Sequence, residues 1–162
     1  MRSEGELNRA MELYADMIQR ICLIHLKNYA DTEDIFQSVF LKYVLSSVVF
    51  ENDAHEKAWF IRVTINACKD LLKSFFRSRT VALTEIHEQI ENMVSEADTA
   101  VIDAVLRLPE KYRKVVYLHY YEGYTASEIG EILGKNVNTI YTYIQRARQM
   151  LKKELGGEND AE

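Results

Sequence analysis

The sequence predicts an all-α protein with two small helical lobes joined by a flexible acidic linker. The 162 residues include one proline and six glycines among many good helix formers, a composition that favours helices over strands. Apolar residues recur at three- and four-residue spacing in both halves of the chain. We expect the first lobe at 1–78, the linker at 79–98, the second lobe at 99–156 with a helix-turn-helix, and a tail at 157–162.

Three helices account for the first lobe. Apolar residues at helical spacing predict a helix over 4–28. Asp31 or Thr32 can cap the second helix, and a third, capped near Asp53, is expected over 56–76. The apolar stripe of the second helix consists of Ile35, Phe36, Val39, Phe40 and Tyr43.

The second lobe begins with a short helix over 99–108. Pro109 suits the first turn of the next helix, because the N–H that proline lacks would be unpaired there. Gly123 should end this helix in a left-handed conformation. The segment 125–128 has the Thr-x-x-Glu pattern of a capping box, which predicts the start of another short helix.

The strongest motif in the chain is a helix-turn-helix over 127–144. Gly134 permits the tight turn, and Asn136 can cap a last helix that ends before Gly156. The buried stripe of this helix is Val137, Ile140, Ile144, Ala147 and Leu151. Its outward face, able to contact bases and phosphates in a major groove, is Asn138, Thr139, Thr142, Tyr143 and Arg146. A plain helical hairpin with a solvated polar face is the alternative.

Charge indicates two separate anionic targets. The net charge is −5, which argues against a protein that coats nucleic acid by bulk electrostatics. Yet the segment 57–79 contains six basic residues and a single acidic one, Asp70, and the segment 135–153 contains five basic residues and no acidic one. One face of the third helix combines cations, an amide and an aromatic ring, which suits single-stranded nucleic acid: Trp59, Arg62, Asn66, Lys69 and Lys73. A solvated basic face with Trp59 as a packing residue is the alternative.

Three segments in this order, 31–43, 57–70 and 108–148, resemble the small extracytoplasmic-function (ECF) sigma factors of bacterial RNA polymerase. The resemblance implies that the second helix binds the clamp of the largest polymerase subunit through Asp34, Gln37, Ser38 and Lys42. It also implies that the third helix and the 45–54 loop recognise and melt the minus-ten element, holding the melted non-template strand. The last helix would read the minus-thirty-five element as duplex. Whether an anti-sigma factor also binds is left open.

Other classes of function fit less well. The four histidines are scattered without a nucleophile at a defined spacing, so we expect no enzyme. Cys22 and Cys68 give neither a disulfide framework nor metal-ligand spacing, and we expect no metal or cofactor. No apolar run is long enough to cross a bilayer, so a cytoplasmic protein without membrane insertion is expected. A stand-alone helix-turn-helix regulator with a helical effector domain remains the competing interpretation.

Overall fold

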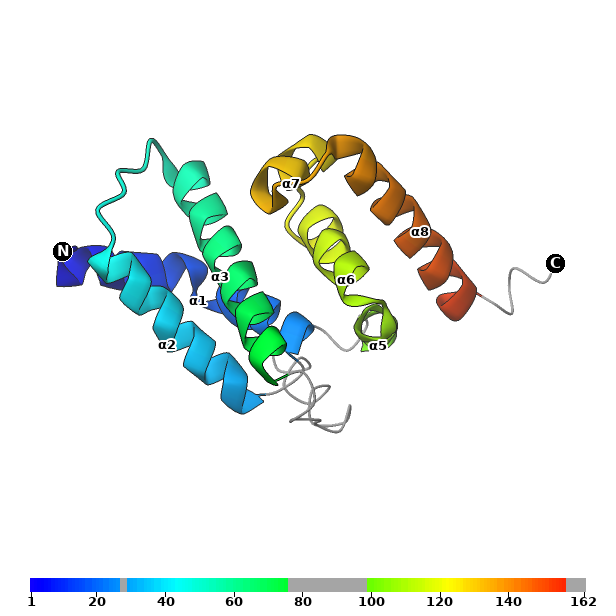
Figure 1. The fold of residues 1–162 in the computed structure, drawn as a ribbon, viewed down its shortest axis with the longest axis horizontal. Helices are drawn as coiled ribbons and strands as arrows, with labels where there is room; N and C mark the ends of the chain where they lie inside the picture. Colours follow the sequence, from blue (N-terminus) through cyan, green and yellow to red (C-terminus); the bar gives the residue numbers. More distant parts are fainter. Residues whose placement is uncertain (27–28, 76–98, 157–162) are drawn as a thin grey trace. The chain divides into compact units, whose positions relative to one another are not determined.

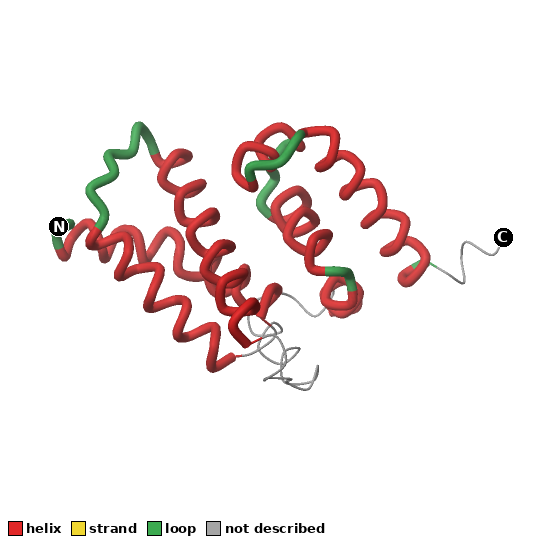
Figure 2. Tube along the Cα trace, in the orientation of Figure 1, coloured by secondary structure: helices red, strands yellow, loops and turns green. Residues whose placement is uncertain are grey.

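All regular structure in the described part of the chain is helical. The computed structural model describes residues 1–26, 29–75 and 99–156 (Figures 1 and 2). The chain divides into two compact lobes, Met1–Ile86 and His87–Glu162. The predicted all-α class is therefore confirmed.

The predicted acidic linker and the tail lie outside the described residues, so both stay predictions.

The first lobe, as far as it is described, is a three-helix bundle in which each helix packs against the other two. Its helices are α1 (Glu4–Leu26), α2 (Tyr29–Leu45) and α3 (Asp53–Phe75). Phe60 of α3 lies fully buried at the centre. Its ring centroid is 4.9 Å from those of Tyr14 on α1 and Tyr43 on α2, and 5.4 Å from that of Phe40. This aromatic cluster joins all three helices.

Two helix starts in the first lobe differ from the prediction. Helix α2 begins at Tyr29, so Asp31 and Thr32 lie inside it, and Thr32 is buried instead of capping the end. Helix α3 begins at Asp53, three residues earlier than predicted, and the side chain of Asn52 accepts a hydrogen bond of 2.8 Å from the His55 N–H. Asn and Asp are equally good caps, so sequence alone did not separate these neighbours.

Within residues 99–156, the described part of the second lobe, there are four α-helices and one π-helical turn. They are α5 (Thr99–Arg107), α6 (Glu110–Val116), η2 (Tyr117–Tyr121), α7 (Ala126–Leu133) and α8 (Val137–Leu155). Part of its core is a cluster to which α5, α6 and α8 contribute: Val105, Leu108, Tyr112, Val116 and Ala147. The long helix α8 contacts α5, α6 and α7 and so organises this lobe.

The helix that follows Pro109 begins one residue later than predicted, and the helical turns after it stop, as predicted, before a left-handed Gly123 with φ of 79°. Pro109 immediately precedes α6, and its carbonyl accepts the N–H groups of Tyr112 and Arg113 at 2.9 and 3.1 Å. The last turn widens into η2, where the N–H of Glu122 bonds to the carbonyl of Tyr117 at 3.1 Å. Nothing in the local sequence signals this π turn.

The helix-turn-helix has the predicted caps. Thr125 and Glu128 form both bonds of a capping box at the start of α7, and Gly134 ends it with φ of 67°. The Asn136 side chain accepts the N–H of Asn138 at 2.7 Å and caps α8. A Cβ at Gly130 would lie 2.8 Å from the Lys135 carbonyl oxygen, so only glycine allows this turn to approach α7.

Candidate nucleic-acid and polymerase interfaces

The predicted polymerase-binding residues share one side of α2. Asp34, Gln37, Ser38 and Lys42 are all exposed. The structure adds two apolar side chains that the sequence analysis missed, Leu41 and Leu45, which are 59% and 63% exposed. Asp34, Ser38, Leu41 and Leu45 follow each other at spacings of four, three and four, which places them on one face. Polar groups around exposed leucines suit a protein partner.

The basic face of α3 consists of Arg62, Asn66, Lys69 and Lys73. All four are exposed, and their spacing of four, three and four residues forms one continuous row. An amide flanked by cations along one row can bond a base edge while the cations contact phosphates.

Trp59, the fifth residue predicted for this face, is half-buried. Its ring lies 5.1 Å from Phe60, 5.8 Å from Phe50 and 6.0 Å from Tyr43, measured between centroids. The structure thus gives Trp59 a packing role at the end of the basic face, where it joins that face to the loop before α3.

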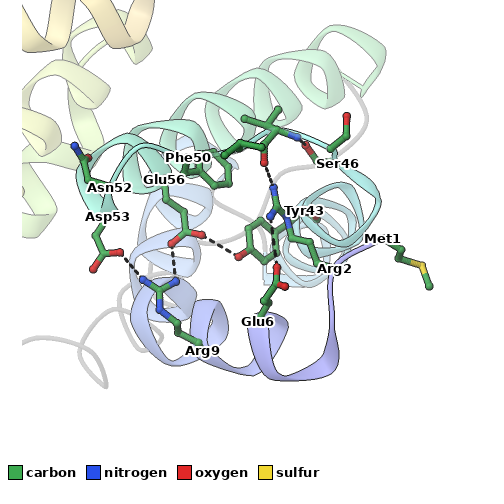
Figure 3. Close-up of a pocket in the computed structure, with 13 residues that line it drawn as sticks. Met1, Arg2, Glu6, Arg9, Tyr43, Ser46, Phe50, Asn52, Asp53 and Glu56 are labelled. Atoms are coloured by element: carbon green, nitrogen blue, oxygen red, sulfur yellow. Dashed lines mark hydrogen bonds and ion pairs between the residues drawn. The ribbon is translucent and has the colours of Figure 1, made fainter.

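That loop, residues 46–52, links α2 to α3 without regular structure (Figure 2). Beside it lies a hollow of about 450 Å³ that the loop shares with the start of α1, the end of α2 and the start of α3 (Figure 3). Arg2, Tyr43, Phe50 and Glu56 are among its lining residues. The loop was predicted to contact the minus-ten element, but the contribution of α1 to its surroundings has no signal in the local sequence.

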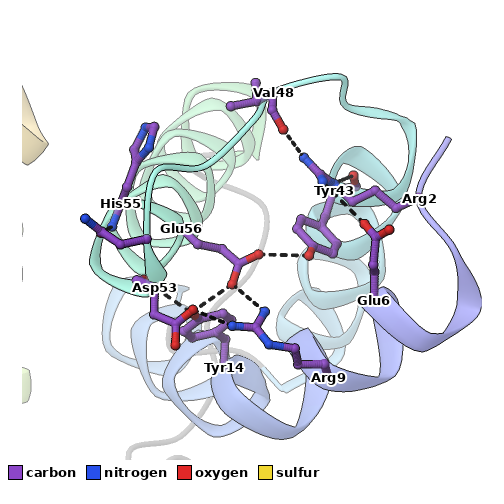
Figure 4. A network of polar contacts seen from close by, with 10 residues as sticks. Arg2, Glu6, Arg9, Tyr14, Tyr43, Val48, Asp53, His55 and Glu56 are labelled. Atoms are coloured by element: carbon purple, nitrogen blue, oxygen red, sulfur yellow. Dashed lines mark hydrogen bonds and ion pairs between the residues drawn. The ribbon is translucent and has the colours of Figure 1, made fainter.

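The buried carboxylate of Glu56 lines the hollow and holds the surrounding side chains in place by hydrogen bonds. Glu56 accepts hydrogen bonds from Tyr43 at 2.9 Å, Tyr14 at 3.0 Å and Arg9 at 2.9 Å, and Arg9 also pairs with Asp53 (Figure 4). Burial by itself would raise the pKa of Glu56, but the bonds from Arg9 and the two tyrosines outweigh it and lower that pKa. Burial and the bond to Glu56 raise the pKa of Tyr43 to about 12. Glu56 is therefore charged and Tyr43 protonated near neutral pH.

The outward face of α8 differs from the prediction at one residue. Asn138, Thr142 and Arg146 are exposed and Thr139 is half-buried. Tyr143, predicted to point outward, instead packs on the core cluster, with its ring 5.4 Å from that of Tyr112. It lies three residues after Ile140 and four before Ala147, so it belongs to the buried stripe.

Tyr141 takes the exposed place that was predicted for Tyr143. It is 60% exposed and lies with His119, Thr125 and Arg148 around a second hollow, of about 560 Å³. On its rim, the Arg148 Nε donates to the hydroxyl of Tyr120 at 2.8 Å.

Comparison with known proteins assigns both lobes. The family model for sigma-70 region 2 matches residues 10–79, and that for sigma-70 region 4 matches residues 98–151. The ECF RNA polymerase sigma factor SigW of Bacillus subtilis is 30% identical over 161 residues, covering 90% of this chain and 86% of that protein. The chain belongs to the ECF sigma factors of the sigma-70 family. RNA polymerase sigma factor SigV of the same species is 27% identical, covering 86% of this chain and 85% of that protein.

Solved structures agree with the fold of this sigma factor. The sigma factor RpoE of Bartonella quintana, solved with the anti-sigma factor NepR, matches with a TM-score of 0.71 and 17% identity, covering 93% of this chain and 97% of that one. CnrH, solved with the cytosolic domain of CnrY, matches with a TM-score of 0.70 and 20% identity, covering 96% and 90%.

The family sets the general activity of the protein. Sigma factors bind core RNA polymerase and direct it to promoters, and neither matched model describes a catalytic family. Among the described residues, no cluster of three or more His, Cys, Asp or Glu side chains could hold a metal ion. Those residues also include no helix long and apolar enough to cross a membrane. Asp34, Asn66 and Arg146 lie inside the matched regions, whereas Arg2 lies outside them.

Proposed function

We propose that the two lobes of this sigma factor divide promoter recognition between them. In this proposal, α2 binds the polymerase clamp through Asp34, Gln37, Ser38 and Lys42. The basic face of α3 and the 46–52 loop bind and melt the minus-ten element. The exposed residues of α8 read the minus-thirty-five element from the major groove.

The observation that carries the proposal is the exposed row of Arg62, Asn66, Lys69 and Lys73 next to an irregular loop. Duplex DNA offers its phosphates to a cationic row, but a base leaves the stack only if protein groups replace what stacking and pairing supplied. The amide of Asn66 within the cationic row supplies an edge contact. The hollow beside the 46–52 loop would supply room for an unstacked base.

For α8, direct reading is assigned to Asn138, Thr139, Thr142 and Arg146. Tyr143 is omitted from this set because it packs on Tyr112. The Thr142 hydroxyl donates to the Asn138 carbonyl at 3.0 Å, which still leaves its oxygen able to accept a bond from DNA.

Two further features belong to the proposal. We place the protein in the cytoplasm, where the polymerase works. Because RpoE was solved with an anti-sigma factor, we also count an anti-sigma factor among the candidate partners of this chain.

A comparison of the protein alone with the reconstituted holoenzyme tests this function. Labelled promoter fragments, selected by sequencing the DNA bound to the holoenzyme, are titrated with each sample at physiological salt. We expect tight, specific binding and transcription only with core polymerase, since a chain of net charge −5 gains little from bulk attraction to DNA. Nanomolar sequence-specific binding by the isolated chain would instead favour the stand-alone regulator.

A further inference from the structure

The 46–52 loop has few internal contacts to hold its shape. Inside the loop the Val48 N–H donates to the Ser46 hydroxyl at 3.1 Å. At its ends the Ser46 N–H donates to the Tyr43 carbonyl at 3.2 Å and the Glu51 N–H to the His55 ring at 3.1 Å. Val48 and Val49 are 39% and 86% exposed. A loop with so little internal support needs contacts from elsewhere to keep one conformation.

Arg2, ahead of α1, supplies such contacts, in addition to those that the Phe50 ring makes with Tyr43, His55 and Trp59. Its backbone N–H donates to the Val44 carbonyl at 2.9 Å, its Nε donates to the Tyr43 carbonyl at 2.9 Å, and its terminal NH2 group donates to the Val48 carbonyl. Arg2 therefore joins the end of α2 to the middle of the loop (Figures 3 and 4). The carbonyls that it binds are separated from it by more than forty residues of sequence.

The guanidinium of Arg2 also packs against the aromatic side of the loop. Its central carbon lies 4.5 Å from the ring centroid of Tyr43 and 5.1 Å from that of Phe50. The remaining NH1 group pairs with Glu6 at 3.5 Å, and the Arg2 side chain is only 14% exposed. A cation so covered and already paired is poorly placed to contact DNA phosphates directly, so its effect must act through the loop.

We propose that Arg2 is a positioning residue for promoter opening, which fixes the 46–52 loop in the conformation that receives the melted minus-ten strand. This inference rests on the proposed function of the loop. A planar guanidinium is required, because one side chain must donate to two separate carbonyls while stacking on rings. A lysine keeps the charge but not this geometry.

The effect of Arg2 on the loop is measured first in the protein alone, by amide hydrogen exchange. In Arg2→Ala, exchange at the hydrogen-bonded N–H groups of Ser46, Val48 and Glu51 should become at least about tenfold faster, the effect expected when the loss of charge-assisted bonds lets the loop open. Exchange in the middle of α1, α2 and α3 should stay unchanged. Glu4→Ala, an exposed change in the first turn of α1, is the control and should leave the loop unchanged. Wild-type exchange at these three N–H groups in Arg2→Ala would overturn the proposal.

The effect on promoter opening is measured next with the holoenzyme. A panel of promoters with single substitutions in the minus-ten element is transcribed with wild type, Arg2→Ala and Arg2→Lys. We expect Arg2→Ala to reduce the preference for the best minus-ten sequence by about tenfold, with polymerase retention unchanged and a pre-melted bubble restoring part of the rate. Arg2→Lys should fall between the other two proteins. Equal preferences in all three would contradict the inference.

Three other outcomes separate a role in positioning the loop from a role in folding and from failure of the proposed function. A uniform loss on every promoter together with lost polymerase retention would mean that Arg2 merely supports the fold. If Arg2→Ala does not fold, the proposal stands or falls on the exchange and promoter preference of Arg2→Lys. If the wild-type holoenzyme opens no promoter, the proposed function fails, while the exchange experiment still reports whether Arg2 orders the loop.

Discussion

At the residue scale, single side chains with unusual surroundings carry the sharpest expectations. Glu56 is the clearest, because one buried carboxylate ties α1, α2 and α3 together through Arg9, Tyr14 and Tyr43. Buried polar groups with partners specify one arrangement of the helices, and removing the shared partner leaves several donors unsatisfied. Gly130 matters for a different reason, because the fold has no room for a side chain at its position.

Glu56 makes the stability of the first lobe depend on acidic pH. Its pKa is lowered in the folded state, so its contribution is complete above the unfolded value near 4.3 and is lost as pH falls through the lower folded value. Denaturant unfolding between pH 7 and 3 should therefore show a decline below about pH 4. Glu56→Gln should lose about 1–3 kcal/mol at pH 7 and decline less steeply. The exposed Glu4→Gln is the control, and an equal slope in Glu56→Gln and wild type would refute the assignment.

Gly130 should tolerate no side chain. A Cβ there would lie 2.8 Å from the backbone oxygen of Lys135, and backbone cannot move aside as a flexible side chain can. Gly130→Ala should therefore destabilise the second lobe by about 1–3 kcal/mol, measured by thermal unfolding. Gly5→Ala is the matched control, because its Cβ would meet nothing closer than 3.9 Å and alanine is the better helix former. If Gly130→Ala proves as stable as wild type, the close approach of turn and helix is wrong.

At the element scale, each candidate interface contains the exposed face of one helix. The opposite faces of α2, α3 and α8 are buried, so a substitution on the exposed face should change binding and one on the buried face should change stability. A pair of variants on α2 tests the exposed face, and a pair on α8 tests the contrast between the two faces.

On α2, Asp34→Arg and Gln37→Ala should weaken retention of core polymerase by about tenfold or more. Both side chains are exposed, so the unfolding transition should stay within about 0.5 kcal/mol of wild type. Glu12→Arg reverses an exposed charge on α1 and serves as the control in the same pull-down. Full retention of polymerase by both α2 variants would remove this helix from the interface.

On α8, Arg146→Ala and Tyr143→Ala should fail in different ways. Arg146→Ala should reduce transcription from promoters that depend on the minus-thirty-five element, without loss of stability. The loss of a base-edge contact should weaken promoter binding by about 1–3 kcal/mol. Tyr143→Ala should destabilise the second lobe by about 3 kcal/mol, because its ring packs on Tyr112. Transcription from promoters with mutated minus-thirty-five elements measures promoter choice, and thermal melts measure the stability of the second lobe. A stable Tyr143→Ala with altered promoter choice would restore this residue to the reading face.

The helices and most of their ends could be predicted because their signals are local. The capping box at Thr125 and Glu128, the left-handed Gly134 and the cap at Asn136 each depend on neighbours within four residues. The inward turn of Tyr143 could have been found from its spacing to Ile140. The π turn after α6 and the contact of Arg2 with the loop could not, because the first has no known sequence signal and the second joins residues far apart in the chain.

At the scale of the whole molecule, the charge pattern explains why a DNA-directed protein is acidic. The cations are concentrated in 57–79 and 135–153, and the net charge is −5. We expect such a chain to bind DNA weakly by itself, since non-specific affinity follows the number of phosphates neutralised. Delivery by the polymerase then restricts DNA contact to promoters, where both lobes have targets.

The most direct test of the account is permanganate footprinting of unpaired thymines at a duplex promoter. Holoenzymes with Asn66→Ala or Lys69→Ala should retain polymerase normally but show reduced reactivity in the minus-ten region, and a pre-melted bubble should restore part of their transcription. Asp70→Asn, which removes a negative charge next to the same face, should open the promoter at least as well as wild type. Wild-type opening by both the Asn66 and the Lys69 variant would contradict the account and leave α3 with a merely solvated basic face.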